Sequence, residues 1–103
     1  MPFPEHPLPA SDDLIHSPYR LRICSLLHRL GDTEYQLLRD SLDISPSVLS
    51  KHLKRLEEAG YIQLSSRTVD TRPHGWASLT ETGRKAFLSH VAYLEQIIRD
   101  AET

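Results

Sequence analysis

The stretch SPSVLSKHLKRLEEA, from Ser45 to Ala59, decides the fold. Successive residues of an α-helix turn by about 100°, and this stretch then divides into two faces. Ser45 suits the N-cap, Pro46 the first helical position, and Gly60 the position after the helix, where φ is positive. The predicted apolar face is Val48, Leu49, His52, Leu53 and Leu56; the opposite face holds Ser47, Ser50, Lys51, Lys54 and Glu58, with Arg55 at its margin. One face therefore packs on a core, and the other presents small hydroxyls and cations.

The composition describes one domain. A chain of 103 residues with 39% hydrophobic and 25% charged residues is long enough for one globular domain and too short for two. Residues 1–10 hold four prolines and are expected to form a flexible or extended arm, with a single domain over residues 11–103. The apolar runs are too short for a membrane span, and the start lacks the features of a signal peptide. The lone cysteine, Cys24, is expected to be a buried structural thiol in a cytoplasmic protein.

The charge is unevenly distributed along the chain. Net charge is −2 overall, yet residues 45–74 carry five Lys or Arg and three Asp or Glu, which gives +2. The rest of the chain therefore carries −4. A locally basic strip on an acidic body is compatible with nucleic-acid binding and only weakly diagnostic of it.

Two further helices are predicted before the opening stretch. Ser17-Pro18 repeats the cap-then-proline start and predicts a helix to about Leu30, ended by Gly31. A short helix over Glu34–Leu42 follows, and Asp43-Ile44 form the turn to the next helix. Two short helices joined this tightly, the second with a polar and basic face, form the helix-turn-helix pattern.

After Gly60 the hydrophobic period changes to two. Residues 61–65 and 76–79 alternate as strands of a hairpin, and the polar stretch from Arg67 to Gly75 is predicted to be a long loop at its tip. Thr80 then caps a final helix over residues 81–101. The order helix, helix, helix, strand, strand, helix predicts a mainly α winged helix-turn-helix with a long C-terminal helix.

The C-terminal helix has more apolar width than one contact within so short a chain needs. Leu21 adds an apolar position on a second, weaker stripe of the first helix. The wide apolar face of the C-terminal helix predicts a partner subunit, whereas the second stripe of the first helix fits equally a contact outside its own core or burial on two sides within one domain. The residues expected at this dimer interface are Leu21, Phe87, Val91, Leu94, Ile97 and Ile98.

Several motifs resemble a known family. VLSKHLKRLEEAGYI (Val48–Ile62) resembles the recognition helix and first wing strand of the MarR and ArsR groups of bacterial transcriptional regulators. LTETG (Leu79–Gly83) resembles the LTxxG through which MarR-type proteins leave the wing and enter their dimerisation helix. The span Asp70–Arg72 resembles the D-x-R of the MarR wing, although the loop after it is one residue longer. Including Ser17–Leu27, the likeness is greatest to compact MarR-like regulators and extends from about residue 13 to 98.

The resemblance implies a homodimer that binds specific duplex DNA and regulates transcription. Its recognition helices would enter successive major grooves, and its wings would lie near the flanking minor grooves. Ser47 and Ser50 are short enough to let the helix approach base edges, and the cations behind them can reach phosphates. The predicted DNA-binding residues are Ser45, Ser47, Ser50, Lys51, Lys54, Arg55, Arg67, Arg72 and His74, the last three standing at the hairpin tip. His52 and Trp76 are expected to pack within the protein, and Glu58 to mark where contact with DNA ends.

Three other functions would need features that the sequence lacks. A metal-responsive ArsR-like sensor needs clustered ligands, but none of the six histidines forms an HxH or HxxxH pair and the single cysteine excludes a thiolate cluster. A winged helix used for protein interaction would expose an apolar rather than a cationic helix face. An enzyme would need more than Ser25 and His28 on one helix. We therefore predict no catalysis, no metal and no cofactor, and any small-molecule effector is expected at the dimer seam.

Overall fold

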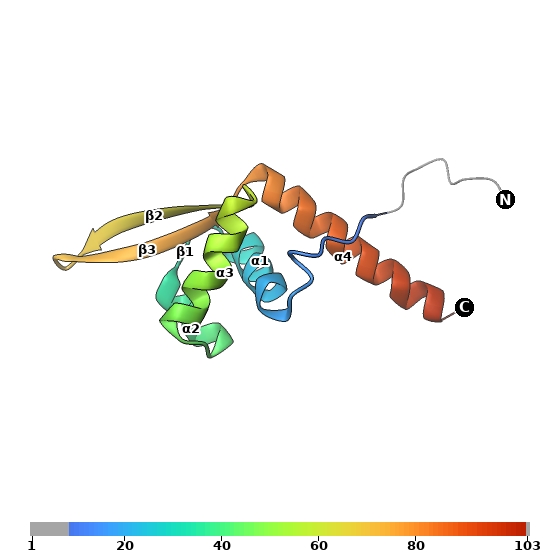
Figure 1. Cartoon of the computed structure of the whole chain (residues 1–103), viewed down its shortest axis with the longest axis horizontal. Helices are drawn as coiled ribbons and strands as arrows, with labels where there is room; N and C mark the ends of the chain where they lie inside the picture. The colour runs from blue at the N-terminus through green and yellow to red at the C-terminus, as the bar shows by residue number, and fades with distance from the viewer. Residues whose placement is uncertain (1–8, 103) are drawn as a thin grey trace.

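The computed structural model describes residues 9–102, which form four helices and a three-stranded antiparallel sheet (Figure 1). The elements in chain order are α1 (Pro18–Leu30), β1 (Thr33–Glu34), α2 (Tyr35–Leu42), α3 (Pro46–Glu58), β2 (Ile62–Val69), β3 (Arg72–Leu79) and α4 (Glu81–Ala101). The predicted winged helix with a long C-terminal helix is confirmed. Most of the predicted proline-rich arm, residues 1–8, lies outside the described residues.

The core lies where α1, α2, α3 and the start of α4 meet the inner end of the sheet. Its members are the apolar residues of these elements and one residue before α1: Ile15, Ile23, Cys24, Leu27, Leu38, Leu42, Leu49, Leu53, Leu56, Ile62, Ala77 and Phe87. Cys24 is buried as predicted, and burial raises the pKa of its thiol to about 12. A thiol in this state is a packing group rather than a nucleophile. No helix within residues 9–102 is long and apolar enough to cross a membrane.

The local start and stop signals act as predicted at most helix ends. The Ser45 hydroxyl accepts a hydrogen bond from the Val48 amide at 3.2 Å, and the Thr80 hydroxyl accepts one from the Gly83 amide at 3.0 Å. Gly31 and Gly60 follow α1 and α3 with φ of 76° and 77°, the left-handed conformation that favours glycine. Ser17 precedes α1, but its side chain makes no capping hydrogen bond.

The start of the second helix was predicted one residue too early, and a strand was missed. Thr33 and Glu34 form β1, which pairs with β3 through Thr33–Ala77 and Glu34–Trp76. Helix α2 therefore begins at Tyr35. The side chain of Thr33 is buried, and a β-branched residue suits such a strand better than the first turn of a helix.

The wing is a longer hairpin than the sequence predicted. β2 and β3 pair without interruption from Ile62–Leu79 to Val69–Arg72, so the predicted loop from Arg67 to Gly75 is wrong. Asp70 and Thr71 make the turn alone, with φ of 49° and 66°, as in the tight turns that join twisted strands. Proline is tolerated within β3 because Pro73 lies beyond the point where β1 pairs with it, at an open strand edge.

The buried residues of helix α4, Gly83, Phe87 and His90, all lie in its first half. Figure 1 shows its C-terminal half extending away from the winged domain, on the side opposite to the hairpin tip. The segment before α1 crosses this helix: the Asp12 amide donates to His90 Nδ1 at 3.0 Å, and the Asp12 carboxylate accepts from the Tyr61 hydroxyl at 2.5 Å. One turn follows Ser11 and is closed by the bond from the His16 amide to the Asp12 carbonyl at 2.8 Å.

Candidate nucleic-acid interface

The exposed face of α3 carries the residues that the sequence assigned to DNA. Leu49, Leu53 and Leu56 are buried against the core and hold the helix in place. The outward residues are all exposed: Ser47, Ser50, Lys51, Lys54 and Arg55. Val48, predicted on the apolar face, is 37% exposed, because the first turn of α3 projects beyond the core. The Ser45 hydroxyl is occupied by the helix cap and lies 3.2 Å from the Ser47 hydroxyl.

His52 packs against α1 at the edge of the interface rather than inside the core. Its Nδ1 lies 3.0 Å from Arg20 Nη1, and its ring centroid lies 5.5 Å from that of Tyr19. Partial burial and the neighbouring cations Arg20, Arg55 and Lys51 lower the pKa of His52. The neutral imidazole therefore accepts a hydrogen bond from the Arg20 guanidinium.

Arg20 is a residue that the sequence analysis missed. Its Nε donates to the Leu14 carbonyl at 2.5 Å while Nη1 reaches His52, so the side chain links the segment before α1 to α3. Leu14 precedes α1 and His52 lies in α3, so helical spacing relates neither partner to Arg20. The sequence carries no signal for this link beyond the presence of a cation near the start of α1.

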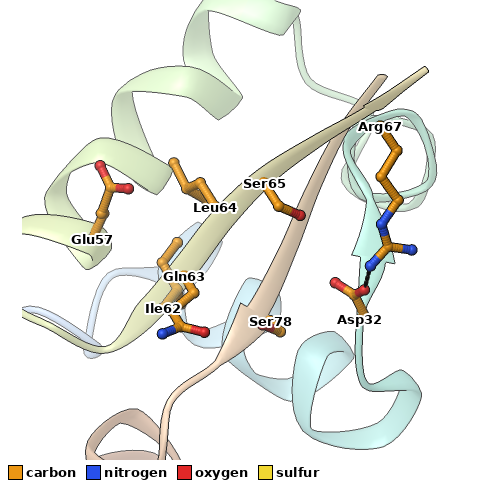
Figure 2. Close-up of a pocket in the computed structure, with 8 residues that line it drawn as sticks. All are labelled: Asp32, Glu57, Ile62, Gln63, Leu64, Ser65, Arg67 and Ser78. Atoms are coloured by element: carbon orange, nitrogen blue, oxygen red, sulfur yellow. Dashed lines mark hydrogen bonds and ion pairs between the residues drawn. The ribbon is translucent and has the colours of Figure 1, made fainter. Parts of the chain in front are cut away.

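Two of the three predicted DNA-binding residues of the wing are engaged within the protein. Arg67 forms an ion pair with Asp32 (Figure 2), and its guanidinium carbon lies 4.4 Å from the centroid of the Trp76 ring. His74, the register partner of Arg67, is bonded to Glu34. Arg67 and His74 lie two pairs inward from the turn, so the prediction that they stand at the tip is wrong.

Trp76 packs across the sheet as predicted. Its indole nitrogen is buried and has no hydrogen-bond partner among the described residues, and the Arg67 guanidinium covers its ring. A cation held over an indole face is attracted by the ring quadrupole. The base of the wing is therefore fixed by the Arg67 stack and by the carboxylates of residues 32 and 34.

Arg72 is the cation that does stand at the tip. It is the first residue of β3, pairs with Val69 across the turn, and is exposed. Its guanidinium has no hydrogen-bond or ion-pair partner among the described residues. The D-x-R of the wing thus places one arginine, unpaired within residues 9–102, at the end of a continuously paired hairpin.

A polar pocket of about 500 Å³ lies between the end of α3 and the wing strands. Figure 2 shows Glu57 on the α3 side of this pocket and the Arg67–Asp32 pair on the other. Two carboxylates and one paired arginine make its lining net acidic. Phosphate groups are repelled from such a surface, as the sequence analysis predicted for neighbouring Glu58.

The predicted dimer residues lie at very different depths. Phe87 is 7% exposed and belongs to the core of its own chain, with its ring 5.5 Å from that of His28. Leu21, Val91 and Leu94 are half-buried. Ile97 and Ile98, on the projecting half of α4, are 47% and 57% exposed. Of the six predicted dimer residues, these last two are the most exposed.

No group of three or more His, Cys, Asp or Glu side chains within residues 9–102 is arranged to hold a metal ion. His16 Nδ1 and His90 Nε2 lie 3.3 Å apart, but His90 Nδ1 already accepts from the Asp12 amide. This pair therefore serves to fix the segment before α1 on α4.

Comparison with known proteins gives consistent results. Residues 19–98 match a family described as winged helix DNA-binding domain. An uncharacterized protein of Methanocaldococcus jannaschii is 28% identical over 89 residues, which cover 86% of this chain and 97% of that protein.

Two solved structures are similar over most of their length. A transcriptional regulator homologue from Pyrococcus horikoshii has a TM-score of 0.81 at 22% identity and covers 87% of this chain and 89% of its own. A structure from Enterococcus faecalis, described as a transcriptional regulator of the MarR family, has a TM-score of 0.70 at 22% identity and covers 86% and 82%. At these identities the two structures show a shared fold.

Proposed function

The chain belongs to the winged helix DNA-binding domain family, and from this premise we propose that it is a sequence-specific DNA-binding transcriptional regulator that acts as a homodimer. The observation that carries the proposal is the division of α3 into a buried leucine face and an exposed face with three cations and two hydroxyls. A major groove about 12 Å wide admits such a helix.

Recognition is assigned mainly to α3. Ser47 and Ser50 pair with base edges or phosphates, since short side chains let the helix approach the groove floor. Lys51, Lys54 and Arg55 lie behind them and neutralise phosphates, each releasing roughly one condensed counterion. Ser45 contributes through the helix N-terminus, where amides favour an anion, because its hydroxyl is already used by the cap.

The wing reaches the flanking minor groove through Arg72. Arg72 is exposed at the tip, where its guanidinium can bind a backbone phosphate at the edge of that groove. Arg67 and His74 would have to exchange Asp32 and Glu34 for phosphates before they could contribute. They are therefore secondary contacts in this proposal.

The dimer is assigned to the projecting half of α4. Ile97 and Ile98 would meet their symmetry mates, with Leu94, Val91 and Leu21 beside them, while Phe87 supports the helix from within its own core. A two-fold axis makes the same patch contact itself and presents two α3 helices to successive major grooves.

A small-molecule effector, if the protein has one, would bind at this seam. Such a regulator acts in the cytoplasm, where Cys24 stays reduced.

A charge-reversal experiment tests the reading face. Lys51→Glu with Lys54→Glu should abolish duplex binding in a gel-shift or anisotropy assay, because two favourable phosphate contacts become repulsive in each protomer. Arg29→Glu with Lys85→Glu changes the net charge equally at two exposed positions outside α3 and should keep most of the affinity. Retained binding by the α3 variant, or equal losses in both, would contradict the assignment.

The dimer is tested separately. Ile97→Asp with Ile98→Asp places four carboxylates in the proposed seam, so light scattering should report monomers whose circular dichroism is unchanged. A dimer that persists would move the interface away from the end of α4.

A further inference from the structure

A second basic site lies between α2 and the wing. A pocket of about 400 Å³ opens there, separate from the pocket at the end of α3. It is lined by Glu34, Tyr35, Gln36 and Arg39 from the β1–α2 segment and by Arg72, Pro73, His74 and Gly75 from β3. Only Arg72 and His74 among these were assigned to DNA from the sequence.

The charges of this pocket are unbalanced. Arg39 and Arg72 have no side-chain hydrogen bond or ion pair with any described residue. Glu34 is the one carboxylate in the lining, and it is bonded to His74. Two guanidinium groups therefore line the pocket beside a single carboxylate, so the lining has an excess of positive charge, and paired guanidinium groups are the chemistry that binds a phosphate oxygen pair.

Two residues of the pocket lining, Tyr35 and Gly75, are in close contact with each other. A Cβ at position 75 would lie 2.3 Å from Tyr35 Cε2, so only glycine lets the Tyr35 ring lie against β3. This contact ties the start of α2 to the wing, and β1 pairs with β3 beside it. The separation between the α2 side and the β3 side of the pocket is thereby fixed before any ligand arrives.

The position of the pocket relates it to the two proposed DNA contacts. Helix α2 contacts both α3 and β3, and in Figure 1 it lies beside α3 and below the hairpin. A DNA strand that borders the major groove holding α3 must pass this point to reach the minor groove under the wing. One strand carries a phosphate about every 3.4 Å, so one of them falls near the pocket.

We propose that this pocket seats one phosphodiester of the DNA backbone, with the Arg39 and Arg72 guanidinium groups as its ligands and the Gln36 amide as a further donor. The inference rests on the proposed function and adds α2 to the DNA-contacting surface. A phosphate held at this point fixes the angle between α3 and the wing on the duplex, and so the register of both contacts.

Salt dependence tests the seat directly. Arg39→Gln should make the negative slope of log K against log salt less steep by about 0.9 per protomer. It should also weaken binding roughly tenfold for each seat lost, to the same extent for all DNA sequences. Arg29→Gln is the matched control, since it removes one exposed arginine of α1 that does not line the pocket. An unchanged slope for Arg39→Gln, or the same fall in the control, would overturn the proposal. If Arg39→Gln unfolds, Arg72→Gln removes the other ligand.

The DNA side of the contact can be changed as well. A duplex with a neutral methylphosphonate at the seated phosphate should bind the wild-type protein more weakly than the unmodified duplex does. The Arg39→Gln protein should bind both duplexes equally well. A scan of single methylphosphonates across the half-site should find one such position, in the flank between the two grooves. If no position removes the difference between the two proteins, the seat does not hold a backbone phosphate.

The two proposals fail in different ways. Wild-type binding that depends on Lys51 and Lys54, with no effect of Arg39→Gln on the slope, refutes the seat alone. No duplex binding by the wild-type protein refutes the proposed function and the seat together. A titration with inorganic phosphate, followed by the NMR resonance of the Arg39 Nε–H, separates a general anion site from a DNA contact. Saturation below about 1 mM phosphate, together with an unchanged salt slope of DNA binding for Arg39→Gln, would overturn the DNA assignment.

Discussion

Gly83→Ala is expected to destabilise the fold strongly, although alanine is the better helix former. Gly83 is buried in the first turn of α4, and its amide bonds the Thr80 hydroxyl at 3.0 Å. By propensity alone, alanine in a helix gains up to about 1 kcal/mol over glycine. The added Cβ, however, would lie 2.0 Å from the Tyr61 carbonyl oxygen.

The size of the effect follows from the groups that must move. An ordinary contact begins at 3.4 Å, so the start of α4 would have to withdraw by about 1.4 Å from the backbone of Tyr61. That movement lengthens the bonds from the Thr80 amide to the Tyr61 carbonyl, at 3.0 Å, and from the Thr80 hydroxyl to the Gly60 carbonyl, at 2.7 Å. Each bond is worth about 1 kcal/mol, and overpacking adds about 1–3 kcal/mol. After the propensity gain, the net loss is about 2–4 kcal/mol.

Urea denaturation followed by circular dichroism measures this loss. The midpoint temperature should also fall by roughly 8–32 °C, at about 4–8 °C per kcal/mol for a domain of this size. Thr82→Ala changes the neighbouring exposed residue and should stay within about 0.5 kcal/mol of wild type. If Gly83→Ala is as stable as the wild-type protein, the close approach of α4 to Tyr61 is not part of the fold.

Two further perturbations follow from the wing and its base. Thr71→Gly should raise the free energy of unfolding by about 0.5–1 kcal/mol, because Thr71 has φ of 66° and glycine adopts this conformation without strain. The strain removed is larger than the extra backbone entropy that glycine loses on folding. A loss of stability in urea denaturation would contradict this. The hydrogen bond to Asp12 and burial raise the pKa of Tyr61 to about 12 from 10.0, so its contribution is fully present below pH 10 and is lost as pH rises through 12. Tyr61→Phe should therefore differ most from wild type below pH 10 and converge with it near pH 12; a difference that is constant with pH would exclude this linkage.

The parts of the fold set by local signals could be predicted from the sequence. Ser45, Thr80 and Gly60 mark helix ends through their own side chains or backbone, and the leucine spacing of α3 fixes its buried face. The register of such a helix does not depend on distant partners. Val48 deviates because solvent reaches the first turn of α3, which helical periodicity does not report.

The parts set by distant pairing could not be predicted in the same way. β1 has only two residues and exists because Thr33 and Glu34 meet β3 more than forty positions later. The outer wing lacks hydrophobic alternation and an Asn-Gly turn, so its strands read as a polar loop. Arg67 was correctly recognised as a wing cation, but its partner Asp32 becomes evident only when β1 joins the sheet.

The candidate site shows the same division. The cations of α3 were found because they share one face of one helix. Arg39 was missed because it stands among core positions of a short helix, and its relation to Arg72 depends on how α2 meets the wing. A surface built from two elements carries no single periodicity in the sequence.

Selection of bound duplexes from a random pool tests the central claim most directly. The account predicts enrichment of an inverted repeat whose half-site centres lie about 10–11 base pairs apart, as two α3 helices in successive major grooves require. The Lys51→Glu, Lys54→Glu protein should enrich nothing from the same pool. Failure of the wild-type protein to enrich any sequence, or recovery of the same motif by the double variant, would contradict the assignment of α3 as the reading helix.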